Sequence, residues 1–213
     1  MENCIVKADD IKVSYFAQLG GGSIFKKTKP SAVWSLTTLY ECIRSSESAK
    51  KATEYLRSLN DETKEKHFKA HGFDLIIPGG TLTSRSRGKN QVCPNGECCI
   101  DVDHISFALR ESLFQNLIDD PELTVDLMFR SPRGHGLKIF LRYDPDEISY
   151  KDFYLSASNY LLFNYGVMAD KACSDITHPC LIPWDDNAFI NKREFDEFKT
   201  ARAESPTPNR AVR

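Results

Sequence analysis

The chain has 213 residues, 41% hydrophobic and 27% charged, and its 28 Lys and Arg against 30 Asp and Glu give a net charge of −2. This length allows a substantial core, and the composition is ordinary for a soluble globular domain. The near-neutral charge excludes a generally basic nucleic-acid coat but allows a local basic groove. We expect one domain over residues 1–199 and a disordered tail or linker over 200–213, where Ser, Thr and Pro alternate.

The sequence also predicts where the protein works. Charged residues at positions 7, 9, 10 and 12 interrupt any signal-like apolar segment, and no uncharged run approaches the roughly 20 residues that a spanning helix needs. We therefore expect a cytoplasmic protein without membrane contact. In that reducing compartment its seven cysteines should be thiols or metal ligands rather than disulfides.

Apolar periodicity and turn residues indicate an α+β fold with a mixed or antiparallel sheet flanked by helices. Capping chemistry at Asn60-Asp61-Glu62-Thr63 opens one of the helices. The expected elements, in chain order, are a strand at 11–16, an apolar segment with Leu36, Leu39 and Ile43, helices at 49–59 and 60–70, a strand at 73–77, a strand at 100–105, a helix at 107–118, a strand–turn–strand unit at 127–142 and a helix at 150–165.

Two acids alternate with apolar residues in Ile100-Asp101-Val102-Asp103-His104-Ile105. Side chains at i and i+2 of a strand share one face, so Asp101 and Asp103 can point together. Such a pair repels itself unless a divalent cation lies between the carboxylates. The repulsion predicts that Asp101→Ala or Asp103→Ala leaves the metal-free fold at least as stable. The competing interpretation is a strand that ends in a polar turn.

A basic hairpin follows in Leu127 to Arg142, where two apolar runs flank Ser131-Pro132-Arg133-Gly134-His135-Gly136. Glycine lets a backbone approach a ligand closely, and Arg133, His135 and Lys138 supply positive charge for a phosphate. An ordinary hairpin with solvated cations is the alternative.

In their order along the chain, IDVD, SPRGHGLKIF, YGVMADKACSD and PWDDNAFIN resemble the catalytic domain of the archaeo-eukaryotic primase superfamily. The resemblance is to its primase-polymerase branch of mobile-element, phage and CRISPR-associated proteins, the VirE N-terminal-like group. It implies an RRM-like palm, two Mg²⁺ or Mn²⁺ ions held by Asp101, Asp103 and Asp170, and a nucleotide on Ser131 and Lys138. Arg133 or His135 would neutralise developing charge.

This sequence departs from the superfamily's pattern at two points. Many members have a histidine on the second hairpin strand where this chain has Lys138, so the phosphate contact passes to Lys138 or to His135 in the turn. The third metal ligand is also open, since Asp170 and Asp175 both follow the apolar stretch. We favour Asp170 because a strand ending at Ala169 could aim it at the first pair, whereas Asp175 lies where a turn or cap is plausible.

The resemblance implies a DNA primase or polymerase that transfers nucleotides by two-metal catalysis. Its partners would be a single-stranded DNA template, a primer, dNTPs or NTPs, and a helicase or other replication module. Two other functions stay open, a metal-dependent nuclease and a catalytically idle nucleic-acid-binding module of a mobile-element replication protein.

Two further sets of residues are candidates for binding. Arg85, Arg87 and Lys89 form a basic cluster that could contact nucleic acid or could be a solvated loop. A zinc-stabilised interaction domain is a separate hypothesis, in which sulfurs on both sides of a turn join later ligands around one ion. The zinc candidates are Cys93, Cys98, Cys173 and Cys180, with His178 as a further ligand.

Overall fold

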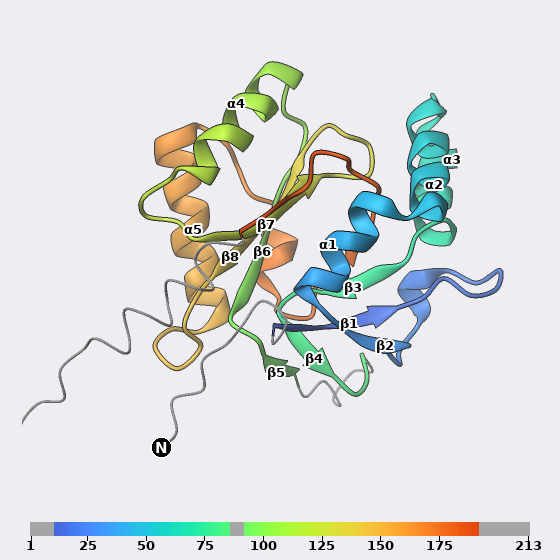
Figure 1. Cartoon of the computed structure of the whole chain (residues 1–213), viewed down its shortest axis with the longest axis horizontal. Helices are drawn as coiled ribbons and strands as arrows, with labels where there is room; N and C mark the ends of the chain where they lie inside the picture. The colour runs from blue at the N-terminus through green and yellow to red at the C-terminus, as the bar shows by residue number, and fades with distance from the viewer. Residues whose placement is uncertain (1–10, 86–91, 192–213) are drawn as a thin grey trace, which may run out of the picture.

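Two antiparallel sheets packed against each other form the centre of the fold (Figure 1). The computed structural model describes residues 11–85 and 92–191. All strand pairs within these ranges are antiparallel, so the antiparallel arrangement is the one found. The predicted α+β fold is confirmed.

The larger strands belong to a sheet whose order is β10-β7-β8-β6. The predicted hairpin is β7 and β8, and β6, which contains Asp101, pairs with β8. This pairing sets Asp101 directly opposite Lys138, so the two side chains share one face of the sheet. The bounds are β6 Glu97–Val102, β7 Val125–Arg130, β8 Leu137–Arg142 and β10 Phe189–Ile190.

A second sheet has the order β2-β1-β3-β9, and a short pair, β4 with β5, lies beside it. The first predicted strand is β1, which lies between β2 and β3 and pairs with both. The bounds are β1 Lys12–Phe16, β2 Ala32–Ser35, β3 Leu75–Ile77, β4 Gly80–Leu82, β5 Val92–Pro94 and β9 Cys180–Leu181.

Serine or aspartate caps open the five α-helices of the described residues, because their side-chain oxygens accept the first free backbone N–H groups. The predicted helices 107–118 and 150–165 are confirmed with their ends. The bounds are α1 Leu36–Ser45, α2 Glu47–Ser58, α3 Glu62–His71, α4 Phe107–Ile118 and α5 Tyr150–Tyr165, with the 3₁₀ turns η1 Ile24–Lys26 and η2 Lys171–Ser174.

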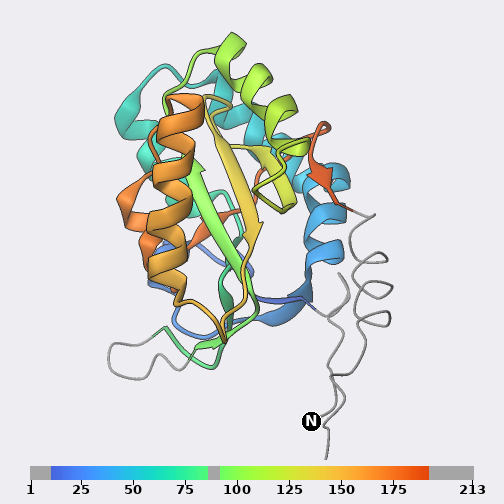
Figure 2. The same ribbon diagram turned by 90° about the vertical axis from the view of Figure 1, so that its left-hand side faces the viewer.

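The two faces of the larger sheet carry separate hydrophobic cores. Figure 2 shows α4 and α5 lying across one face, where Leu113, Tyr154 and Leu161 pack on alternate residues of β6 and β8. The opposite face, with Phe129 and Phe140, packs against α1 and the second sheet. Asp101 and Lys138 belong to this second face, at the end of β6.

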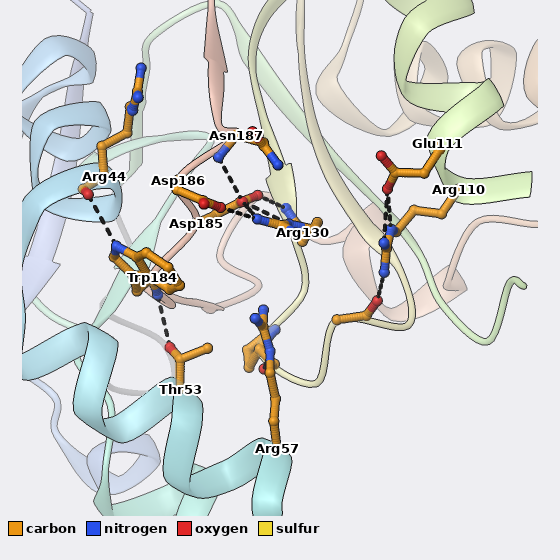
Figure 3. A network of polar contacts seen from close by, with 12 residues as sticks. Arg44, Thr53, Arg57, Arg110, Glu111, Arg130, Trp184, Asp185, Asp186 and Asn187 are labelled. Carbon is orange, nitrogen blue, oxygen red and sulfur yellow. Dashed lines mark hydrogen bonds and ion pairs between the residues drawn. The ribbon is translucent and has the colours of Figure 1, made fainter. Parts of the chain in front are cut away.

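Trp184 and Asp185, near the C-terminal end of the described residues, form hydrogen bonds that connect α1 and α2 to the larger sheet (Figure 3). Arg130 at the end of β7 donates through its backbone N–H and its guanidinium to Asp185, whose side chain is fully buried. The Trp184 backbone N–H donates to the Thr53 hydroxyl on α2 (2.8 Å), and its indole N–H donates to the Arg44 carbonyl oxygen (3.1 Å).

No helix within residues 11–85 and 92–191 is both long enough and apolar enough to cross a membrane.

Candidate metal centre

Asp101 is a buried carboxylate with one oxygen left over. Its side chain is 6% exposed, and Oδ2 forms an ion pair with the ammonium of Lys138, itself 14% exposed. Oδ1 has no hydrogen-bond partner among the described residues. Because an unsatisfied buried oxygen costs on the order of 1–3 kcal/mol, more when charged, this atom is suited to an additional positive partner.

The turn η2 brings two more ligand atoms to Asp101. Gly166 ends α5 in the left-handed conformation (φ 67°), and the chain returns toward β6 without forming a strand. The prediction that Asp170 follows the end of a strand is therefore wrong. Asp170 caps η2 instead, and its Oδ1 accepts from the Ala172 N–H (3.0 Å). In a 3₁₀ turn residues three apart align, which places Cys173 on the same side as Asp170.

Backbone contacts fix η2 against β6 and α5. The Asp170 N–H donates to the Asp101 carbonyl oxygen (2.8 Å), and the Tyr154 hydroxyl donates to the Asp170 carbonyl oxygen (2.5 Å). The Tyr150 hydroxyl donates to the Cys173 carbonyl oxygen (3.2 Å). One ligand atom each from Asp101, Asp170 and Cys173 lies within 4.8 Å of the others, which is the only such group of His, Cys, Asp or Glu in the described ranges.

These three groups differ in exposure and in chemistry. Asp170 is exposed, whereas Cys173 is buried. Burial raises the pKa of the Cys173 thiol to about 12, and the nearby Lys138 ammonium opposes that rise. The thiol is therefore neutral near pH 7 unless a cation replaces its proton.

Asp103 lies at the rim of this group rather than within it. It is exposed and follows the last residue of β6, and the next residue, His104, has a positive φ of 58°. Gly136 packs beneath it so closely that a Cβ there would lie 2.7 Å from Asp103 Oδ1 and 2.2 Å from the Val102 carbonyl oxygen. Asp103 is therefore not a member of the group of Asp101, Asp170 and Cys173, and its role as a metal ligand stays a prediction.

The hairpin loop of residues 131–136 is held by arginines from outside it. Arg57 on α2 donates through Nε to the Pro132 carbonyl oxygen (3.1 Å), and Arg110 on α4 donates to the Gly134 carbonyl oxygen. The Ser131 N–H donates to the Gly136 carbonyl oxygen (2.9 Å) across the loop. These contacts hold the predicted nucleotide loop in one conformation beside Asp103.

Most predicted cations of the hairpin have partners of their own. Arg133 forms an ion pair with the buried Glu65 of α3 (2.6 Å), and Lys138 pairs with Asp101. His135 is exposed, while its carbonyl oxygen accepts from the Ile105 N–H (3.0 Å). The predicted phosphate contacts therefore require these pairs to rearrange or a ligand to join them.

Two basic side chains from other elements, Lys69 and His178, lie within electrostatic reach of Lys138. Burial lowers the pKa of the Lys69 ammonium on α3, which lies within electrostatic reach of Asp103 and Lys138. Burial also lowers the pKa of His178, and the charge of Lys138 lowers it further. His178 should therefore be neutral at pH 7, able to accept a proton or a hydrogen bond.

The remaining predicted residues within the described ranges are not members of the group. Asp175 accepts from the Thr177 N–H and hydroxyl, both at 2.8 Å, which is the local turn role expected for it. Arg85 is half-buried with its guanidinium 5.5 Å from the centre of the Phe16 ring, and burial lowers its pKa. Arg87 and Lys89 lie outside the described residues.

The structure does not gather the four cysteines of the zinc hypothesis. Cys93 is exposed on β5, whereas Cys98 is packed in the core between β6 and α5, where burial raises its thiol pKa to about 12. Cys180 lies beside Cys99 on the opposite face of β6. No group of three of these thiols forms within the described ranges.

Local sequence patterns did not identify Arg57, Lys69 and Arg110 as candidate site residues. All three lie on charged helices, where such residues are usually solvated. Their positions depend on how α2, α3 and α4 dock around the hairpin loop, which is a tertiary property. By contrast, Cys173 had a local signal, since it follows Asp170 by three residues in a segment that a glycine separates from a long helix.

One family matches this chain in comparisons with known proteins. It is described as BT4734-like, N-terminal domain, and the match covers residues 68–189, more than half of the chain. The matched span contains β6, the hairpin and η2, and so all three members of the gathered group. No curated protein and no solved structure matches the chain significantly.

Proposed function

This chain belongs to the BT4734-like N-terminal domain family, and we propose that it is the catalytic domain of a DNA primase or DNA polymerase. In this proposal it transfers nucleotides to a primer or a first nucleotide on a single-stranded DNA template. One observation carries the proposal: a buried carboxylate, Asp101, has one oxygen without a hydrogen-bond partner among the described residues, and it lies next to Asp170 and opposite Lys138 of the hairpin. The resemblance to primase-polymerases supports the proposal, because it implies the same two residues, Asp101 and Asp170, as metal ligands.

The residues present fit a divalent cation. Asp101 Oδ1 has no hydrogen-bond partner among the described residues and can accept a cation, and Asp170 uses Oδ1 for its cap, which leaves Oδ2 outside that contact. Carboxylate oxygens are ligands of Mg²⁺ and Mn²⁺. Asp101 and Asp170 would hold the first ion, and Asp103, on the exposed rim, would serve a second ion nearer the substrate.

Bound divalent cations would lower the pKa of the attacking hydroxyl and offset charge on the triphosphate. The chain's own groups position the reactants. Lys69, within electrostatic reach of Asp103, and Lys138, paired with Asp101, would supply positive charge to the phosphates. Ser131 and the loop that Arg57 and Arg110 hold would orient the nucleotide without a rearrangement of the backbone. A helicase or other replication module would be the partner in the cell.

Two matched substitutions test this proposal with labelled nucleotides, a single-stranded template, and Mg²⁺ or Mn²⁺, with and without a primer. Asp170→Asn should reduce incorporation at least 100-fold (on the order of 3 kcal/mol of barrier), because the amide keeps the shape but loses the charge. Asp175→Asn is the control and should retain activity, since Asn caps a turn about as well as Asp.

The products decide among the alternatives. Full activity of both variants would refute two-metal catalysis at this site, and an inactive Asp175→Asn beside an active Asp170→Asn would move the third ligand. Shortened rather than extended DNA would identify a metal-dependent nuclease.

A catalytically idle nucleic-acid-binding module is the second candidate, and the Lys138–Asp101 pair favours it. An ammonium already balances the carboxylate, so the site is electrically satisfied without a metal. This candidate predicts equal binding of single-stranded DNA in Mg²⁺ and in EDTA, measured by fluorescence anisotropy, with no incorporation under any condition. Metal-dependent incorporation excludes it.

A further inference from the structure

We propose that Cys173 is a metal ligand, and that Asp101, Asp170 and Cys173 form a mixed carboxylate–thiolate site for thiophilic divalent cations such as Co²⁺ and Zn²⁺. The inference deepens the proposed function by naming the class of metal at that site, and it rests on that function only for the role of the metal. The ligand set differs from the three carboxylates expected from the sequence, because the gathered group contains the sulfur of Cys173 and does not contain Asp103.

The geometry supports Cys173 as more than a packed apolar residue. Buried cysteines are often small hydrophobic residues of a core, and Cys173 does contact the core under α5. Its sulfur, however, lies within 4.8 Å of oxygens from two carboxylates. One of these carboxylates, Asp101, is 94% buried and has an oxygen without a partner in the described ranges. A cation held by this sulfur and both carboxylates would give that oxygen a partner.

The three ligands come from rigidly connected elements. The bond from the Asp170 N–H to the Asp101 carbonyl oxygen joins η2 to β6, and Tyr154 and Tyr150 hold the backbone of η2 from α5. A site built from three protein ligands leaves a coordination position for water or substrate, which is typical of catalytic rather than structural sites.

Ligand softness determines which cation this set prefers. Mg²⁺ favours oxygen and keeps several waters, whereas a thiolate favours Zn²⁺ and Co²⁺. Binding forms a metal–sulfur bond and releases the thiol proton to solvent, so the site exchanges one proton for the cation. Lys138 can keep its contact with Asp101 Oδ2 while the metal takes Oδ1.

Cobalt titration of the full chain tests the inference without any activity measurement, because a cysteine thiolate bound to Co²⁺ gives a charge-transfer absorption band in the near ultraviolet. The wild type should show this band with one equivalent of Co²⁺. Cys173→Ser should abolish it, and Cys93→Ser, the matched control at an exposed thiol of β5, should keep it. A 100-fold excess of Mg²⁺ should not displace Co²⁺ from the wild type.

Asp170→Asn is a second variant that tests the inference even if Cys173→Ser misfolds. It should fold normally, since Asp170 is exposed and its turn can be capped by Asn. It should weaken Co²⁺ binding at least tenfold while the circular dichroism spectrum stays unchanged. A wild type without the band overturns the inference, as does a band that survives Cys173→Ser or an affinity that Asp170→Asn does not change.

The two proposals can fail separately. A Cys173-dependent band without nucleotide incorporation in any cation would support the metal site and refute the proposed polymerase function. Asp170-dependent incorporation without a sulfur–cobalt band would support the proposed polymerase function and refute Cys173 as a metal ligand.

Discussion

Replacing Asp101 by alanine should destabilise the metal-free protein. The like-charge argument from the sequence predicts equal or greater stability, but it assumes that the carboxylate has no cationic partner. In the structure Asp101 pairs with Lys138, and the side chains are 6% and 14% exposed. Asp101→Ala therefore leaves an ammonium largely buried without a counter-charge, so for this variant we expect a loss of stability instead.

The expected loss follows from that burial. Removing one member of a buried ion pair costs roughly 3–5 kcal/mol, and the partial exposure of Lys138 lets water relieve part of it, so we take about 3 kcal/mol. At about 2–4 °C per kcal/mol for a chain of this size, the melting temperature should fall by about 6–12 °C.

Urea denaturation in EDTA measures this effect in Asp101→Ala, Lys138→Met and the double variant. The double variant should be more stable than Asp101→Ala alone, since it has no buried ammonium, and the coupling energy should be about 1–3 kcal/mol. Asp170→Asn, whose carboxylate is exposed, should stay within about 0.5 kcal/mol of wild type. If Asp101→Ala unfolds at the wild-type urea concentration, the pair does not stabilise the fold and the reasoning is refuted.

Two further predictions concern other parts of the larger sheet. Burial and the neighbouring charge of Asp126 raise the pKa of Glu97 well above its usual 4.5, so the folded state keeps a proton that the unfolded state loses above that pH. The contribution of Glu97 to stability should thus fall as pH rises above about 4.5. The melting temperature of Glu97→Gln minus that of wild type should therefore increase from pH 5 to pH 8, and a constant difference contradicts this. Gly136→Ala should cost about 1–3 kcal/mol in urea denaturation because its Cβ would lie 2.2 Å from the Val102 carbonyl oxygen, whereas Gly21→Ala, with no atom within 4 Å, should be neutral. Equal stability of the two alanine variants would contradict this, because it would mean that the hairpin backbone accommodates the added Cβ without loss of folding free energy.

Local patterns predicted the elements better than the contacts between them. Helix α5 and the hairpin strands have strong periodicity and clear end signals, so their ranges were predictable. The approach of Asp170 to Asp101 was predicted for a wrong reason, because a capped 3₁₀ turn, not a strand, brings it there. The Lys138–Asp101 pair depends on the register of β6 with β8, and 37 residues separate the partners in sequence, so no local pattern encodes it.

The region shared with the family and the unit that folds have different boundaries. The match begins at residue 68, after β1 and α2, yet β1 lies between β2 and β3 in its sheet. A protein trimmed to 68–189 would expose an unpaired edge of β3 and remove Thr53, the hydroxyl that accepts from the Trp184 N–H. The face with Phe129 and Phe140 would lose its cover from α1. Recombinant versions cut at the edges of sequence similarity should therefore aggregate, and the shortest useful expression unit must include residue 11 onward.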